Sequence, residues 1–571
     1  MTKILARSSL SAADHSAVLR AKRTVAAIGT RIILWVRKAG LLLFLCAVVI
    51  VASLILGGGT RPGYISDAIL QLLAVPLLLL SLWTLVETPL TKQMRQALWF
   101  CFAIALLPLI QLIPLPPWLW TVLPGRQPAV ETFDILGRTL PWMPTSVSPQ
   151  LTWLTALSVI PPLAVFLSVL LLGYQERRLL SLVFLAVGAI GAFVGLLQVA
   201  GGPESPLRFF EITNPTEAVG FFANRNHFAA LLYCLILLLV PWVVDATTNA
   251  VSREYRNKIE YDLTSMVVAG VGFLGLFLFF AAEAMARSRA GLGLTLLALF
   301  GAVGIGFCVQ RPRSGFLANK VLLGAVVLTL VFALQFALFR IMERFTPDSI
   351  EDARITISSV TFQAAFANLP FGSGLGTFVP VYALFEKPEG LSDAFVNRAH
   401  NDALEFLLET GVLGLVMTGI FLIWLVRRSF EIWKNAPTDD AAELDLSLAR
   451  SATLVAGLLL IHSLVDYPLR TTAMMIVMAF ACGLMIEPPA GANSNAGFWR
   501  QASERPSRRS SRKPKQVDPQ RPRLASPIGI STSDRPSSST QKWGADVQWP
   551  EQWSSADEAP KASKPGDDDR K

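Results

Sequence analysis

Three of the four histidines in this chain lie in polar segments at the ends of long apolar runs. The segments are Asn224-Arg225-Asn226-His227, Arg398-Ala399-His400-Asn401 and His462-Ser463-Leu464-Val465-Asp466. Histidine is costly inside hydrocarbon, and it is the side chain that exchanges a proton near neutral pH. If the three segments face the same side of a membrane, they predict a polar site in which a neutral imidazole acts as a general base.

Arginines accompany the histidines at the same ends of the apolar runs. They are Arg225, Arg287, Arg289, Arg354 and Arg398. An arginine is always charged and binds a phosphate through two parallel hydrogen bonds, so a cluster of arginines is what a diphosphate group would select. Taken singly, each arginine can instead extend its charge to the lipid head groups, and for Arg287 and Arg398 the two interpretations are equally open.

Several polar neighbours of the histidines have structural interpretations as well. Asp402 and Glu405 have the spacing of a helix cap, which would make both acids structural. His227 can be a hydrogen-bonding spacer between its asparagine neighbours and the helix bundle. A single network that holds the last two apolar runs together is a further alternative, and its members would be His462, Asp466 and Arg470.

The apolar runs predict an all-α polytopic membrane protein with about 12 transmembrane helices, because a bilayer core takes about 20 apolar residues to cross. The runs cover approximately 40–57, 67–86, 97–118, 151–172, 179–200, 222–244, 265–283, 291–309, 320–339, 403–426, 450–466 and 471–487. With an even count, both termini lie on one side. When that side is the cytoplasm, most of the 50 Lys and Arg residues fall on it, as the positive-inside rule demands. The histidine segments then face the outer side of the membrane.

Three regions follow from this topology. Residues 1–39 form a basic cytoplasmic segment, residues 40–487 form the membrane domain, and residues 488–571 form a disordered cytoplasmic tail rich in Ser, Pro and Arg. The basic ends carry the net charge of +9, and they are expected to contact anionic membrane lipids. No nucleic-acid partner is needed to explain the charge.

The longest outer loop, about 340–402, has a length typical of a functional loop. Asp348 and Glu351 predict a capping box that opens a helix carrying Arg354 and ending near Leu369-Pro370. Gly372, Gly374 and Gly376 follow, and they favour a tight turn over close contact with a ligand. The outer loops contain neither an Asp-x-Asp pair nor two histidines four residues apart, so the sequence predicts no metal site.

Five segments together resemble the bacterial O-antigen ligase and polymerase superfamily over roughly residues 40–487. They are Gly220-Phe-Phe-Ala-Asn-Arg-Asn-His227, Ala286-Arg-Ser-Arg289-Ala-Gly, Gly372-x-Gly-x-Gly-x-Phe with Tyr382, Ala399-His-Asn-Asp-Ala-Leu-Glu405-x-x-x-Glu409-x-Gly411, and His462-Ser-Leu-Val-Asp466-Tyr-Pro. The resemblance implies a GT-C-like fold with a large helical periplasmic loop. It also implies an inverting glycosyltransferase that uses an undecaprenyl-diphosphate-linked glycan as donor and needs no metal or other cofactor.

The resemblance also implies roles for individual residues. His400 would take the proton from the acceptor hydroxyl, and Arg225 and Arg289 would bind the diphosphate, with Arg287 as a rival for the second position. Arg354 matches a frequent loop arginine. The other polar residues of the matching segments are expected around the substrate, namely Asn224, His227, Asn401, Glu405, His462 and Asp466. The long tail departs from the compact pattern of the family.

Two other classes of function stay open, a polytopic transporter such as a flippase of lipid-linked glycan, and a membrane scaffold. A transporter is expected to have related halves, and no such similarity is visible. A scaffold would have no reason to gather His and Arg on one face. Within the transferase class, the acceptor can be lipid A-core, a growing glycan or a protein, and the sequence does not separate these three.

Overall fold

The computed structural model describes residues 40–489, apart from 62, 212, 254–258, 309–323, 325–348, 388–395 and 438–439. The expected cytoplasmic segments 1–39 and 490–571 lie outside the described residues. So do Asp348 of the expected capping box and almost all of the expected span 320–339.

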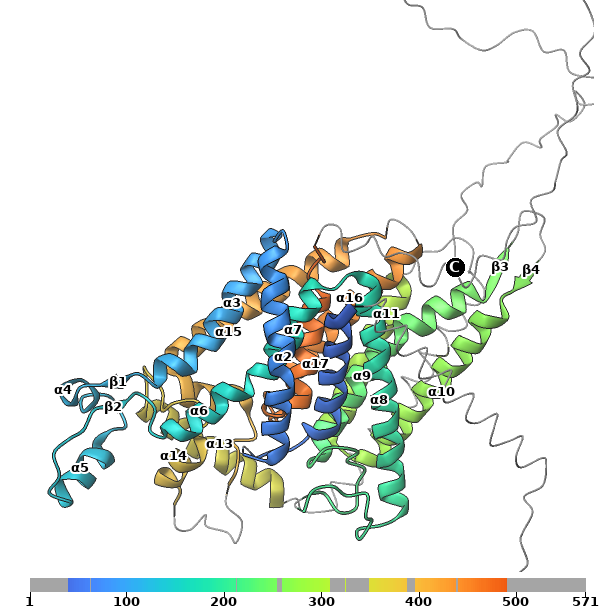
Figure 1. Cartoon of the computed structure of the whole chain (residues 1–571). Coiled ribbons are helices and arrows are strands. Elements are labelled where there is room, and N and C mark those ends of the chain that lie inside the picture. Colours follow the sequence, from blue (N-terminus) through green and yellow to red (C-terminus); the bar gives the residue numbers. More distant parts are fainter. Residues whose placement is uncertain are drawn as a thin grey trace, which may run out of the picture. The chain divides into compact units, whose positions relative to one another are not determined.

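Apolar helices dominate the described part of the chain (Figure 1). Nine of these helical segments are long and apolar enough to cross a membrane. They are α2 (Ile65–Glu87), α3 (Lys92–Gln111), α6 with α7 (Pro149–Ser158 and Ile160–Leu171), α8 (Tyr174–Ala200), α9 (Arg225–Asn249), α10 (Leu263–Ala286), α11 (Arg289–Cys308), α15 (Asp402–Lys434) and α16 (Asp440–His462). Two shorter apolar helices are Gly40–Leu56 and α17 (Thr472–Leu484). Every predicted span that falls within the described residues therefore has its helix.

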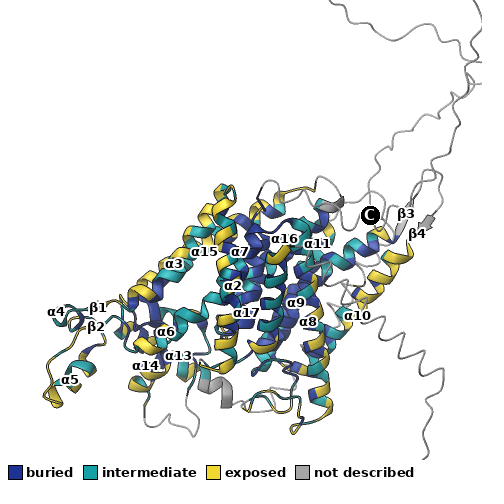
Figure 2. Ribbon diagram, viewed as in Figure 1, coloured by how far each residue is buried: buried dark blue, intermediate teal, exposed yellow. Residues whose placement is uncertain are grey.

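Helix α9 forms the centre of the bundle, and several other helices have lipid-facing sides (Figure 2). In α9, 78% of the apolar window is buried, whereas the corresponding share is 22% in α2 and 17% in α3. A helix that is apolar all round belongs inside a protein or a membrane. The outer helices expose large side chains such as Trp83, Trp99 and Phe277. Such broad exposed apolar surface is what lipid contact requires, and it identifies the chain as a multi-pass membrane protein.

At one end of the bundle, buried arginines hold the C-terminal ends of helices. Arg177 donates hydrogen bonds to the carbonyls of Val169, Leu172 and Ile486 at 2.9, 2.9 and 2.5 Å. Arg428 donates to the carbonyl of Met485 at 2.5 Å. The last carbonyls of a helix lack partners within the helix and carry partial negative charge, so a buried guanidinium stabilises them. Arg177 and Arg428 belong to the basic segments that the positive-inside rule assigns to the cytoplasm, and they also have a packing role.

The other end of the bundle carries additional short elements. Strands β1 (Pro114–Leu115) and β2 (Met143–Pro144) pair antiparallel and enclose helices α4 (Pro117–Trp120) and α5 (Gln127–Ile135). The expected span 97–118 therefore ends early, at Gln111. At the end that carries Arg177, a second antiparallel pair, β3 (Val251–Arg253) and β4 (Ile259–Tyr261), connects α9 to α10. The all-α expectation holds among the described residues except for these two pairs.

The stretch between α11 and α15 contains two further helices. Helix α13 covers Ser349–Ala367 and α14 covers Phe378–Phe385. Helix α13 carries Arg354 and ends close to the predicted Leu369-Pro370. Helix α13 packs against α15, and a small apolar cluster that includes Val360, Phe378 and Leu408 joins α13, α14 and α15. These helices place Arg354 beside the start of α15.

Candidate active site

A buried carboxylate, Asp466, is the centre of a polar cluster drawn from four segments. Its Oδ1 lies 3.4 Å from Nδ1 of His400 and 4.0 Å from Nε2 of His227. Its Oδ2 accepts a hydrogen bond from the side-chain amide of Asn226 and lies 3.9 Å from Nη2 of Arg354. The cluster thus joins the start of α9, helix α13, the loop before α15 and the loop after α16.

The surroundings of Asp466 keep its carboxylate ionised. Burial raises the pKa of this carboxyl, but the neighbouring His400, His227 and His462 lower it, and the net pKa is well below the ordinary value. The backbone N–H of Tyr467 also donates to Oδ1 at 3.0 Å. Asp466 is therefore a fixed negative charge beside His400.

His400 combines an unusual backbone with an accessible ring. Its φ is 51°, and Arg287, with φ 49°, is the only other non-glycine residue with a positive φ in the described part of the chain. Such conformations cost energy and gather at functional sites. The side chain is 24% exposed, compared with 1% for Asp466. The His400 side of the His400–Asp466 pair is thus accessible, and the Asp466 side is buried.

The other two histidines are enclosed. His227 is fully buried, its ring lies edge-on to Tyr467 at a centroid distance of 4.7 Å, and neither of its ring nitrogens has a hydrogen-bond partner among the described residues. His400 packs against the same Tyr467 at 5.0 Å. Nδ1 of His462 lies 3.2 Å from the hydroxyl of Tyr233. These enclosed rings contribute to the electrostatic environment of Asp466, and His400 is the exposed member of the set.

Three of the sequence-predicted arginines are adjacent to residues of this cluster. The side-chain carbonyl of Asn226, which follows Arg225, accepts a hydrogen bond from the Ser288 hydroxyl at 2.8 Å. Ser288 stands between Arg287 and Arg289 and also accepts from the backbone N–H of Gly291 at 3.0 Å, at the start of α11. The Asn226–Ser288 bond thus brings Arg225, Arg287 and Arg289 to the same end of the bundle as His400.

The local roles of these residues differ. Nη1 of Arg225 pairs with Oε1 of Glu217 at 2.6 Å, and the Arg225 side chain is still 32% exposed. Glu217 has no signal in the sequence, because it lies in a loop without a motif. Arg287 is exposed at the C-terminal end of α10. Asn224 caps α9 by accepting from the backbone N–H of Asn226 at 2.8 Å.

Two interpretations of the segment around His400 are wrong. The capping residue of α15 is Asn401, which accepts from the N–H of Leu404 at 3.0 Å, and Asp402 is already inside the helix. Arg398 is buried and pairs with Oε1 of Glu405 at 2.8 Å, so it does not extend its charge to the lipid head groups. In both cases a carboxylate, that of Asp402 or that of Glu405, is buried, and a buried carboxylate needs a counter-charge.

The alternative of a single network of His462, Asp466 and Arg470 is also wrong, because Arg470 is not part of it. Arg470 does not pair with Asp466. It pairs with Asp402 and Glu409 on α15, at 3.2 and 2.8 Å. The loop after α16 therefore contributes to two separate polar groups, one around Asp466 and one around Arg470.

The glycine-rich segment packs against a kink in α15, which agrees with its interpretation as a tight turn. Gly411 has φ 60° and ψ −145° inside the helix, a conformation open to glycine alone. The N–H of Val412 donates to the carbonyl of Pro370, and the N–H of Gly374 donates to that of Glu409, both at 2.9 Å. A Cβ on Gly372 would lie 2.6 Å from the Glu409 carbonyl oxygen. The glycines thus permit close approach between two protein segments.

Comparison with known families agrees with this geometry. A family model described as O-antigen ligase matches residues 274–419. The matched region contains the Arg287-Ser288-Arg289 turn, α13 with Arg354, the glycine-rich segment and His400, whereas Arg225 and Asp466 lie outside it. A search of curated proteins finds no match. Over residues 274–419 the chain is similar to the O-antigen ligase family, and the match falls within its apolar helix bundle and includes part of the polar cluster at one end.

Proposed function

We propose that this protein is an inverting glycosyltransferase of GT-C-like fold at the periplasmic face of the bacterial inner membrane. The donor is a glycan linked to undecaprenyl diphosphate, and the acceptor is a hydroxyl group of lipid A-core or of a growing polysaccharide. The observation that carries the proposal is the pairing of an accessible His400 with a buried, ionised Asp466 at 3.4 Å, beside arginines of the matched family region.

His400 is the general base of this reaction. Because its Nδ1 faces Asp466, its Nε2 is the nitrogen left for the acceptor hydroxyl. As Nε2 removes the hydroxyl proton, the acceptor oxygen attacks the anomeric carbon, and the bond from that carbon to the diphosphate oxygen breaks. The bonding electrons leave with the lipid diphosphate. Asp466 stabilises the imidazolium that forms, as a buried carboxylate does in other acid–base pairs.

The arginines act on the leaving group. Negative charge grows on the diphosphate as the glycosidic bond breaks, so guanidinium groups aimed at it stabilise the transition state more than the ground state. Arg225 and Arg289 are assigned to this role, with Arg287 beside them on the same turn. Arg354, 34% exposed and 3.9 Å from Asp466, extends the positive charge toward His400. The arginines supply the charge that a divalent cation supplies in metal-dependent transferases, so the proposed reaction needs no metal.

The test uses purified protein with an undecaprenyl-diphosphate glycan under two conditions. In the first, the donor is alone, and longer glycans on the lipid diphosphate identify a polymerase. In the second, lipid A-core is added, and a glycan on lipid A-core identifies a ligase. Movement of intact donor across vesicles without any covalent product would contradict the proposal and establish a flippase.

A further inference from the structure

Three buried carboxylates follow one another along the first turns of α15. Asp402, Glu405 and Glu409 are all at most 8% exposed, and all precede the kink at Gly411. Residues three and four apart share a helix face, so the three acids lie side by side. Acids near the N-terminus of a helix suit its macrodipole, but three buried negative charges in contact require counter-charges.

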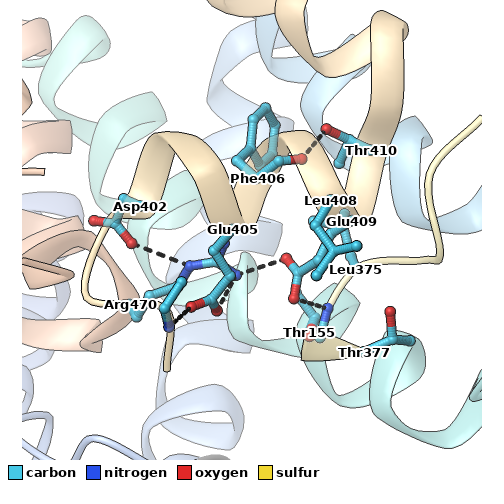
Figure 3. A network of polar contacts seen from close by, with 12 residues as sticks. Thr155, Leu375, Thr377, Asp402, Glu405, Phe406, Leu408, Glu409, Thr410 and Arg470 are labelled. Atoms are coloured by element: carbon cyan, nitrogen blue, oxygen red, sulfur yellow. Dashed lines mark hydrogen bonds and ion pairs between the residues drawn. The ribbon is translucent and has the colours of Figure 1, made fainter. Parts of the chain in front are cut away.

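Arg470 contacts all three acids (Figure 3). It lies in the short 3-10 helix η2 (Pro468–Arg470), shortly after Asp466. Its Nε is 3.2 Å from Oδ1 of Asp402, and its Nη1 is 2.8 Å from Oε2 of Glu409 and 3.5 Å from Oε1 of Glu405. Burial lowers the pKa of Arg470 and the three carboxylates raise it, and the net pKa is above the ordinary value. Arg470 is therefore a permanent cation at the centre of the acids.

Each acid also accepts a backbone hydrogen bond from a different loop. Glu405 accepts from the N–H of Ala399, directly before His400, at 2.9 Å. Glu409 accepts from the N–H of Gly376 in the glycine-rich segment, also at 2.9 Å. Asp402 accepts from the hydroxyl of Ser463 at 2.9 Å and from the N–H of Leu469 at 3.3 Å, and these two residues flank Asp466 in sequence.

We propose that Arg470 is a positioning residue for glycosyl transfer, which acts by clamping the loops of His400 and Asp466 onto α15. This inference rests on the proposed function of the His400–Asp466 pair. The left-handed backbone of His400 must be imposed by its neighbours, and the Ala399 bond to Glu405 is one such restraint. The N–H of Asp402 donates to the carbonyl of Ser463 at 2.8 Å, which ties the same helix end to the Asp466 loop.

The first variant is Arg470→Gln, which leaves Arg398 as the one remaining arginine partner of the three acids among the described contacts. Repulsion between the acids then loosens the loops on both sides of the His400–Asp466 pair. We expect kcat per inserted molecule to fall about 100-fold, the effect of a misplacement of roughly 1 Å. The KM for the undecaprenyl-diphosphate glycan should not change, because the Arg470 side chain is only 14% exposed and is engaged by three carboxylates. Arg470→Lys keeps the charge but loses the planar guanidinium group, so its kcat should lie between those of the wild type and Arg470→Gln.

A matched control and a compensated variant separate positioning from stability. Arg178→Gln removes another arginine–carboxylate ion pair, Arg178 Nε to Asp445 Oδ1 at 2.5 Å, at the opposite end of the helices, and its kcat should equal that of the wild type. The double variant Arg470→Gln/Glu409→Gln removes one of the repelling acids. Any loss of membrane abundance caused by Arg470→Gln should be reversed in the double variant, whereas kcat should stay low because the clamp is still missing.

A thermodynamic cycle with Asp466→Asn tests whether Arg470 acts through the catalytic pair. If it does, the two losses in kcat are not additive, since each variant damages the same arrangement. A normal kcat in Arg470→Gln, a loss that follows abundance alone, or a rise in donor KM at constant kcat would each overturn the inference. The proposed function fails separately, when wild-type protein gives no transfer or when His400→Ala retains it.

Discussion

At the scale of single residues, His400 offers an accessible ring and Asp466 a buried charge, and the proposed proton transfer needs both. The histidine could be predicted from the sequence, because a polar residue at the end of an apolar run already marks a site. The partnership with Asp466 could not, because the two residues lie far apart in the chain and meet only through the packing of α15 and α16. The same holds for Arg470, whose three acids lie on another helix.

Asp466→Asn tests the partnership directly. The amide keeps the shape of the side chain but removes the charge that stabilises the imidazolium, so kcat should fall about 10²- to 10⁴-fold. Donor KM should change little, because Asp466 is buried away from the open face of the site. Initial rates with purified variant and undecaprenyl-diphosphate glycan provide the measurement. An Asp466→Asn enzyme with wild-type kcat would leave His400 without a charged partner.

The arginine variants test donor binding. Lysine keeps the charge of Arg225 or Arg289 but loses the two parallel hydrogen bonds, so each Arg→Lys variant should raise donor KM, and each Arg→Ala variant should nearly eliminate transfer. A higher donor concentration should partly rescue the lysine variants. Rates across a donor titration show whether this holds, and an unchanged donor KM in both lysine variants would reassign the diphosphate site.

At the scale of elements, the kink of α15 determines where the glycine-rich segment and the His400 loop meet. Hydropathy predicted an apolar helix from 403, and the structure has one, but the kink at Gly411 divides it into a polar, buried part and an apolar, lipid-facing part. Periodicity could not reveal this division, because the bend depends on contacts with Pro370 and Gly372. The β1–β2 pair likewise escaped prediction, since its strands are only two residues long.

Gly411→Ala tests the kink. A Cβ at this position would lie 2.1 Å from the carbonyl oxygen of Pro370, and the backbone conformation is unsuitable for alanine. We expect a loss of at least about 1–3 kcal/mol in unfolding free energy, visible as a lower melting temperature of the purified protein. Gly419→Ala is the matched control on the same helix, where a Cβ meets open space and should be neutral or stabilising. Equal melting temperatures for the two variants would show that the kink is not required.

At the scale of the whole molecule, charge predicts the orientation of the bundle and packing refines it. Arg177 and Arg178, which the positive-inside rule assigns to the cytoplasmic side, lie together at the end of the bundle opposite His400. Their grouping supports the proposed orientation, although Arg177 is fully buried and caps helix ends. Composition alone could not show whether an arginine such as Arg177 marks the cytoplasmic side, packs against helix ends, or does both.

Reporter fusions test this orientation. A fusion near Lys387, between α14 and the His400 loop, should be active in the periplasm, and a fusion after Glu487 should be active in the cytoplasm. The reason is the excess of basic residues on the proposed inner side. Paired alkaline phosphatase and fluorescent-protein fusions give opposite signals at each position. A cytoplasmic signal at Lys387 would place the site on the wrong face for a periplasmic transferase.

The roles of His400 and the arginines are tested together by the rate of glycan transfer by purified protein in the presence of a metal chelator, with wild type and His400→Ala side by side. Wild-type protein should transfer glycan from undecaprenyl diphosphate at an undiminished rate, because arginines provide the positive charge and His400 provides the base. His400→Ala should give no transfer at equal abundance in the membrane. Transfer that requires an added divalent ion, or normal transfer by His400→Ala, would refute the metal-free mechanism with His400 as base.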